Sequence, residues 1–205
     1  LSAAPAFLRV QPGADMTTTV ASVISRAATL LQDTAMTRWT QAMHVTNLNE
    51  GSIELVKIKP DAKTKTVTVA LVAGAKQSNP DDCIAIVELR QNNGGTSILP
   101  CDRGALDAFS PNWMTAPVSA TVKHYMDDPQ PDTFYVYPAQ PASPGSVVMT
   151  YAAMPVVVVY GGNIDVRDIY AEALVNYLLY KACAMEDEAG AAEKAVAYLQ
   201  MFKGA

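Results

Sequence analysis

Two stretches of the chain repeat apolar residues at the spacing of an α-helix, and they enclose a region where the spacing is that of a β-strand. In the first stretch, apolar residues at steps of three and four predict a helix over residues 19–33, capped by one of three successive threonines. A second helix is predicted from Thr40 and ends before Pro60, because a proline disfavours helical geometry in the residue before it. Gly51 and residues 43–46 are poor helix formers and weaken this segment.

From residue 63 onward the period changes to two, and turn residues separate short apolar runs. The predicted strands span residues 66–72, 83–90, 120–126, 133–137 and 146–152. The third and fourth of these strands form a hairpin around a turn rich in aspartate and proline. A short helix is predicted over residues 102–109, with Asp102 near its start. Together these segments predict a small antiparallel sheet domain.

The helical period returns after two successive glycines, and it predicts a third helix over residues 166–181 and a last helix over residues 191–202. The pattern predicts an α+β fold, in which the N-terminal and C-terminal helices form one bundle with the β domain inserted between them. The expected boundaries are 16–62 and 161–205 for the helices and 63–160 for the insertion.

The first fifteen residues do not fit this pattern. Residues 1–15 lack the basic start and continuous apolar core of a signal peptide, and Met16 resembles a natural initiator. We therefore expect residues 1–15 to form an irregular N-terminal arm.

Composition narrows the classes of partner. The 205 residues are 50% apolar but only 17% charged, below the roughly 25% of ordinary domains. A surface this poor in charge favours permanent protein partners, although a compact monomer rich in Ala, Val and Thr fits equally well. The net charge of −5 argues against a dominant phosphate-binding face, which needs clustered Lys and Arg. The longest apolar run, residues 154–160, is strand-like and shorter than the roughly 20 residues of a membrane span, so no membrane contact is expected.

The sequence carries no pattern typical of catalysis or of a bound group. The cysteines and histidines lack the spacing of a zinc motif or a disulfide framework; they are Cys83, Cys101, Cys183, His44 and His124. His44 is expected at the surface of the second helix. The aspartates of the hairpin turn, Asp127, Asp128 and Asp132, do not match the spacing of a calcium loop. We therefore expect no catalytic residue, no metal and no cofactor.

Aromatic residues near helix ends are the candidate contact residues. Arg38 and Trp39 lie between the first two helices, where an aromatic side chain beside a cation can anchor an interface. The alternative is that Trp39 packs on its own helices. The tyrosines of the last two helices include Tyr177, Tyr180 and Tyr198, and some of their hydroxyls are expected to face another subunit or water.

Several motifs, in this order and spacing, resemble the head-to-tail adaptor (head completion) proteins of short-tailed and related tailed phages. They are Asp33 with residues 37–40, residues 47–51 and 54–56, residues 60–62, the strand 122–125, residues 133–138 and the helix 168–180. Together they cover most of the chain from Met16 on. Residues 43–46 replace a strongly helical Glu-Leu-Leu run of the family, and residues 1–15 have no counterpart in it.

This resemblance implies a structural, non-enzymatic virion protein made in the cytoplasm of a bacterial host. It implies a ring, usually of twelve copies, that docks beneath the portal protein, presents its other face to tail or nozzle proteins and lets genome DNA pass through its bore. The C-terminal end would reach toward the portal and the β insertion toward the tail. The expected interface residues are therefore Arg38, Trp39, Tyr177, Tyr180, Tyr198, Leu199, Met201, Phe202 and Lys203.

Two other functions fit the same sequence. One is a small-molecule-binding or hydrolytic α+β domain with its site between the bundle and the sheet. The other is an assembly chaperone that leaves the finished particle. Ring formation separates the first alternative from the adaptor, and presence in purified virions separates the second.

Overall fold

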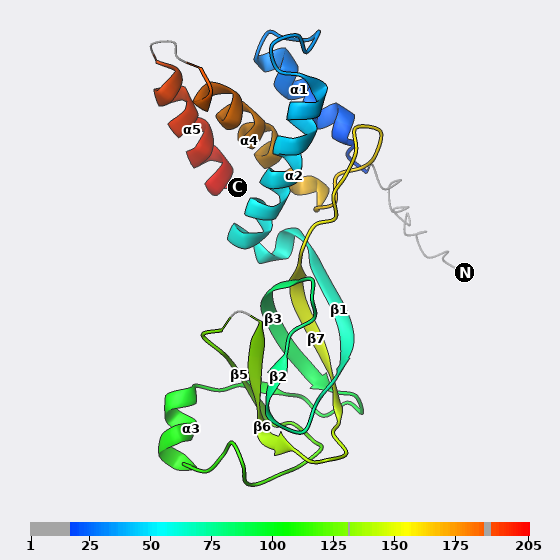
Figure 1. The fold of residues 1–205 in the computed structure, drawn as a ribbon, viewed down its shortest axis with the longest axis vertical. Helices are drawn as coiled ribbons and strands as arrows, with labels where there is room; N and C mark the ends of the chain where they lie inside the picture. Colours follow the sequence, from blue (N-terminus) through cyan, green and yellow to red (C-terminus); the bar gives the residue numbers. More distant parts are fainter. Residues whose placement is uncertain (1–16, 131, 187–189) are drawn as a thin grey trace, which may run out of the picture.

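The computed structural model describes residues 17–130, 132–186 and 190–205, so the arm predicted over residues 1–15 lies outside the described part. Within that part the chain has five α-helices and two small sheets, and is an α+β protein as predicted. Four of the helices gather at one end of the molecule and the strands at the other (Figure 1). No helix in these ranges combines the length and apolar character needed to cross a membrane.

The first two helices begin where the sequence predicts. Thr19 caps α1 (Val20–Leu30), and its side chain accepts the Ser22 N–H at 3.1 Å. Thr40 caps α2 (Gln41–Ile58) by accepting the Met43 N–H at 3.3 Å. A single turn of 3-10 helix (Pro60–Ala62) follows α2. Each cap satisfies a backbone donor that has no partner within its helix.

The weak helix formers in the middle of α2 do not interrupt the predicted helix. Residues 43–46 lie inside one continuous helix, and His44 is buried with 2% of its surface exposed, so its expected surface position was wrong. Burial also lowers the pKa of His44. Packing against the rest of the molecule outweighs the weak helix propensity of this run.

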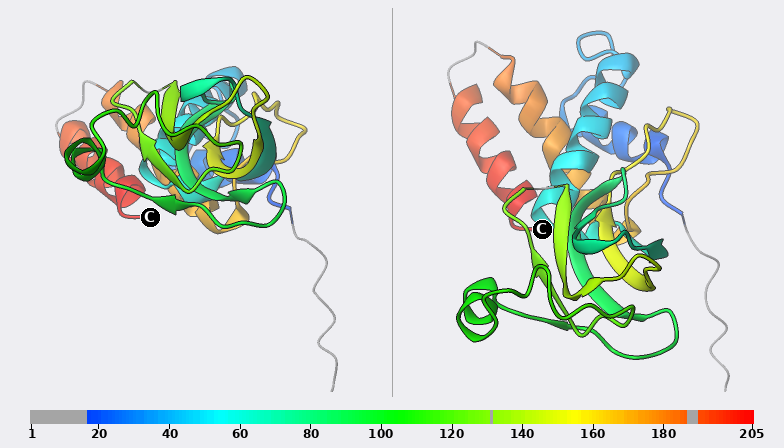
Figure 2. Two further views of the ribbon diagram at one scale, coloured as in Figure 1. Left: turned by 90° about the horizontal axis from the view of Figure 1, so that it is seen from below. Right: turned by 60° about the horizontal axis from the view of Figure 1, so that its bottom comes forward.

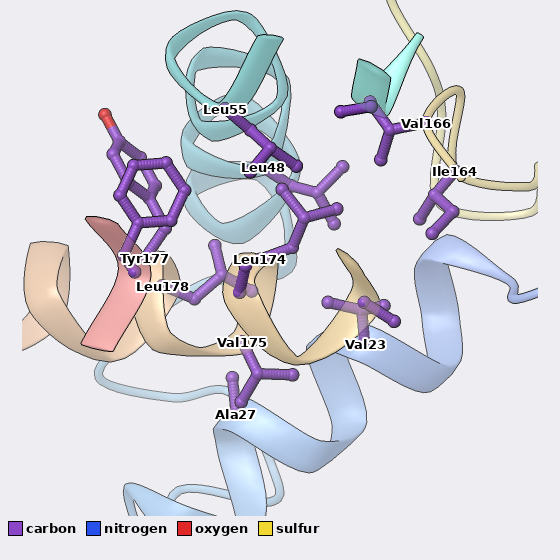
Figure 3. Packing of buried hydrophobic residues seen from close by; sticks show 14 of the residues in the cluster. Val23, Ala27, Leu48, Leu55, Ile164, Val166, Leu174, Val175, Tyr177 and Leu178 are labelled. Carbon is purple, nitrogen blue, oxygen red and sulfur yellow. The ribbon is translucent and has the colours of Figure 1, made fainter. Parts of the chain in front are cut away.

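The two C-terminal helices are α4 (Ala171–Ala184) and α5 (Ala191–Lys203). A 3-10 turn (Asp168–Tyr170) precedes α4, which therefore starts later than predicted. Helix α4 contacts α1, α2 and α5. The shared core of these helices also takes in the loop before α4, as Figure 3 shows for Val23, Ala27, Leu48, Leu55, Ile164, Val166, Leu174, Val175, Tyr177 and Leu178.

Gly51 has a packing role in the middle of α2. A Cβ atom built on it would lie 2.6 Å from Cδ1 of Tyr177 on α4. The Tyr177 ring is itself held by Tyr180, at 5.7 Å between ring centroids, and by Phe202, at 5.0 Å. A glycine is therefore required where α2 and α4 approach each other.

The strands form two sheets that share a core. One sheet has the order β1-β7-β3, from β1 (Thr64–Ala70), β7 (Ser146–Ala153) and β3 (Cys83–Asn92). The other has the order β2-β6-β5-β4, from β2 (Gly74–Ser78), β6 (Thr133–Gln140), β5 (His124–Asp127) and β4 (Leu99–Pro100). Phe134, Met149 and Tyr151 are buried in this core.

Several details of the sheets depart from the sequence prediction. The pair β4 and β5 is parallel, so an entirely antiparallel domain was wrong, and β2 was not predicted. The hairpin of β5 and β6 is antiparallel as predicted, although its first strand begins only at His124. The short helix α3 (Arg103–Phe109) has the expected cap, since Asp102 accepts the Ala105 N–H at 2.8 Å.

We predict that Gly51→Ala lowers the free energy of unfolding by roughly 1–2 kcal/mol, because overpacking against Tyr177 outweighs the roughly 1 kcal/mol that alanine gains in helix propensity. Chemical denaturation measures this change. Gly94→Ala is the matched control, because no atom lies within 4 Å of a Cβ built at Gly94. In a Tyr177→Leu background the Gly51→Ala substitution should no longer destabilise; an equal loss there would show that the ring is not the cause.

Candidate interaction surfaces

Asp33 fixes the connection between α1 and α2. One of its carboxylate oxygens accepts the Thr37 N–H at 2.9 Å, and the other accepts the N–H groups of Arg38 at 2.9 Å and Trp39 at 2.8 Å. The bond from Trp39 is the largest single cause that holds the Asp33 pKa at about 2, with the bonds from Thr37 and Arg38 adding to it. The motif of Asp33 and residues 37–40 is therefore a turn whose N–H groups are capped by the Asp33 carboxylate, and it sets the position of Arg38 and Trp39.

A polar hollow lies beside this turn. Its volume is about 310 Å³, and it is enclosed by the end of α1, by α4 and by α5. Arg38 and Glu186 form an ion pair at 3.3 Å on its wall, close to Lys194 and Tyr198. The structure thus brings together two of the predicted interface residues, Arg38 and Tyr198. Cys183 also lines the hollow, and burial raises the pKa of its thiol, which disfavours the reactive thiolate.

The nine predicted interface residues fall into three groups by exposure. Trp39, Tyr177 and Phe202 are buried within the chain, with 7%, 7% and 1% of their surfaces exposed. Tyr180, Tyr198 and Leu199 are half-buried, and Arg38, Met201 and Lys203 are exposed. Only the second and third groups can reach a partner without rearrangement of the core. An interface through them stays a prediction.

An exposed apolar segment joins β7 to the last helices, and the sequence alone did not indicate it as a site. We name residues 154–163 the strap; it is the yellow loop beside α1 in Figure 1. Val156, Val157 and Val159 are 63%, 82% and 67% exposed, although this apolar run looks like a strand in the sequence. Pro155 before the valines and the glycines after them were the only signals that the run is not a regular strand.

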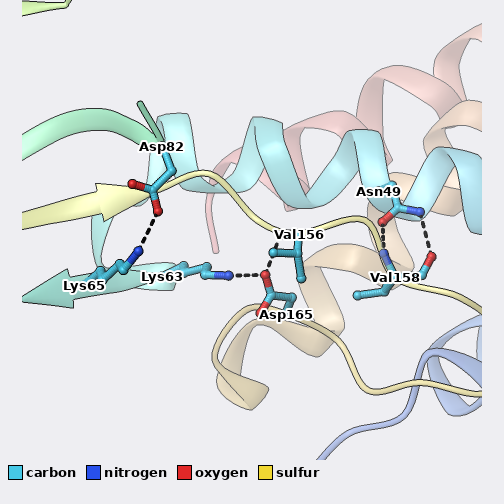
Figure 4. Close-up of polar contacts among 7 residues, drawn as sticks. All are labelled: Asn49, Lys63, Lys65, Asp82, Val156, Val158 and Asp165. Atoms are coloured by element: carbon cyan, nitrogen blue, oxygen red, sulfur yellow. Dashed lines mark hydrogen bonds and ion pairs between the residues drawn. The ribbon is translucent and has the colours of Figure 1, made fainter. Parts of the chain in front are cut away.

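Two side chains, Asn49 on α2 and Asp165 in the loop after the strap, hold the strap in place (Figure 4). The amide of Asn49 on α2 donates to the Val158 carbonyl at 3.0 Å and accepts the Val158 N–H at 2.8 Å. Asp165, paired with Lys63, accepts the Val156 N–H at 2.6 Å. The strap is therefore fixed through its own backbone. Val158 packs against the helical core, and the side chains of Val156, Val157 and Val159 remain exposed.

A separate ion pair lies in the β1-β7-β3 sheet, near the start of the strap. Asp82 accepts a hydrogen bond from the Tyr151 hydroxyl at 2.7 Å and pairs with Lys65 at 3.0 Å (Figure 4). The bond from Tyr151 and then the one from Lys65 hold the pKa of Asp82 below its usual value. Tyr151 is buried in the core of the sheets, so its hydrogen bond to Asp82 and the Asp82–Lys65 ion pair stabilise the sheet.

The far end of the β region carries a second exposed apolar group. Phe109, at the end of α3, is 92% exposed, and Val118 is 58% exposed. Trp113 fixes the segment between Phe109 and Val118. Its side chain is fully buried, and its indole N–H donates to Asp107 at 2.6 Å. Helix α3 lies at the end of the protein away from α1, α2, α4 and α5 (Figure 2), so the exposed Phe109 belongs to that end.

No group of three or more metal-ligating side chains occurs among residues 17–130, 132–186 and 190–205. In the hairpin turn, Asp128 accepts bonds from Gln130 and Thr133 and pairs with Lys76. Its carboxylate is therefore engaged in the structure of the turn.

A protein-family model matches most of the chain. The model of the SU10 adaptor protein family matches residues 18–205, and this family is one of phage head–tail adaptors. A search of curated proteins finds no match. The matched range includes the capped turn, the polar hollow, the strap and the exposed end of the β region.

We predict that Asp33→Asn destabilises the protein at neutral pH, because an amide replaces one of the two acceptor oxygens. The native pKa of Asp33 is lowered from 3.8 to about 2, so the carboxylate stabilises the fold above pH 4, and this stabilisation is lost as pH falls through about 2. Unfolding midpoints of the two proteins, measured from pH 7 to pH 2, should differ most at neutral pH and converge in acid. Asp81→Asn at an exposed carboxylate is the control, and a difference that is constant across the pH range would contradict the prediction.

Proposed function

We propose that the protein forms a ring between the portal protein and the tail. The chain belongs to the SU10 adaptor protein family, which is a family of phage head–tail adaptors. The observation that carries this proposal is the family match, which extends over residues 18–205. In this proposal α1, α2, α4 and α5 act as one bundle that builds the ring, and the β region is an insertion. The ring has about twelve copies, as the resemblance to head completion proteins implies.

The distribution of exposed groups supports two different partners. Arg38, Tyr198 and Lys203 lie in the helical half of the protein, and we assign the portal to this half. Phe109 lies at the opposite end, and we assign the tail or nozzle protein to it. A junction protein has to bind different partners at its two ends, and exposed apolar side chains on a rigid support suit such contacts.

The charge of the chain supports passage of DNA without binding. Each copy has a net charge of −5, so a ring of many copies is strongly acidic as a whole. A bore with that charge repels phosphates and disfavours the counterion release on which non-specific DNA binding depends. Genome DNA would then slide through the ring during packaging and ejection.

We predict that light scattering of the purified protein, alone and mixed with the portal protein of the same phage, detects a ring. The expected mass is about twelve times the 21.9 kDa of one chain, either for the free protein or for the complex after subtraction of the portal. A stable monomer that does not bind the portal protein would contradict the proposal and favour a ligand-binding domain. Mass spectrometry of purified virions is the second arm, because an assembly chaperone would be absent from them.

A further inference from the structure

We propose that the strap is the contact between neighbouring copies in the ring, and that it packs on the outer face of α5 of the next copy. This inference rests on the proposed ring and adds to it the two surfaces that close it. It starts from Val156, Val157 and Val159, which stand exposed on a segment whose backbone is held in place.

The polar anchors of the strap explain why it suits an interface. Asn49 pairs with both backbone groups of Val158, and Asp165 holds Val156. At the far end, the Val20 N–H donates to the Gly162 carbonyl at 3.0 Å. A segment fixed in this way loses little conformational entropy on binding, so burial of its valines stabilises a complex with little offset. Without a partner, the same anchors hold apolar surface in water.

The exposed face of α5 is the matching surface. Helix α5 packs mainly on α4 and buries only Ala191, Ala195 and Phe202. Its outer face leaves Val196 and Met201 exposed at 56% and 58%. A terminal helix covered on one side only, with large apolar residues on the other, is suited to packing against a further element.

The positions of the two surfaces favour a second copy as the occupant. Figures 1 and 2 show the strap and α5 on opposite sides of the helical end, with α1 and α2 between them. A closed ring needs two different, complementary surfaces on each copy. In a ring of many copies each subunit turns only slightly relative to the last, about 30° for twelve, so these surfaces have to face nearly opposite directions.

The distribution of charge also favours a second copy of this chain as the partner of the strap. Copies with a net charge of −5 repel one another, so contact between them is easiest through uncharged patches. The strap carries no acidic or basic side chain. On α5 the residues from Val196 to Met201 are uncharged as well, whereas Glu193 lies one turn earlier on the same face.

The test is the double substitution Val157→Asp and Val159→Asp. Both side chains are exposed, so the circular dichroism spectrum and the unfolding midpoint should stay close to those of the wild type. Light scattering, with or without the portal, should show at least a tenfold loss of ring at a concentration where the wild type is assembled. Val72→Asp is the matched control, because Val72 is an exposed valine (58%) in the β region. Unchanged ring formation by the double variant would overturn the inference.

Disulfide trapping tests the pairing itself. A mixture of Val157→Cys chains and Val196→Cys chains should give cross-linked dimers above the background of the wild type, which has its own cysteines. Three results would contradict the proposed pairing. In the first, Val157→Cys chains cross-link with one another, and in the second they cross-link to the portal. In the third, a maleimide labels the thiol at position 157 equally in ring and monomer. The last result would leave the strap free or place it against some other segment.

The two proposals fail differently. If the wild-type chain forms no ring alone or on the portal, the proposed function is wrong. If the wild type assembles and the double variant assembles equally well, the function stands and only the assignment of the strap is wrong.

Discussion

The close packing of α2 on α4 is the constraint on which the rest of the structure depends. Nine residues of the fourteen in α4 are buried, and the glycine at position 51 lets α4 lie against α2 without a close contact between a Cβ atom and Tyr177. The same core contains Ala62 and Ala152 from the base of the β region, together with Ile164 and Val166 from the loop before α4. The chain therefore has to leave the helices, build both sheets and return, and one continuous core joins its early and late helices to the start of the sheets.

Polar side chains then fix the two connections that carry candidate contact residues. Asp33 gathers the N–H groups of the turn before α2, and Asn49 does the same for the strap. Loops of this kind are usually the most mobile parts of a domain. Here their shapes are set by carboxylate and amide groups, so Arg38 and the strap valines are presented in defined positions. This arrangement suits a protein whose contacts are with other proteins.

The sequence was informative where a local rule decides the structure. The α+β class and most helix starts could be predicted from the helical periods and from the caps at Thr19, Thr40 and Asp102. A period or a cap depends only on residues that are close together in the sequence. Strand β2 was missed because Gly74–Ser78 is short and polar and pairs with β6 through an irregular register. The exposure of the strap depends on Asn49, which lies 109 residues before Val158, and no local pattern encodes that pairing. The same limit applies to Phe202, which looks like a contact residue in the sequence but is buried by packing on Tyr177.

The most direct test of the whole account is electron cryomicroscopy of the head–tail junction in the intact virion, at a resolution that separates helices. We predict a ring of this chain between portal and tail, with the helices toward the portal and the strap of each copy lying on α5 of the next. A junction without this chain, or a ring in which the strap faces solvent and neighbouring copies meet through other surfaces, would contradict it.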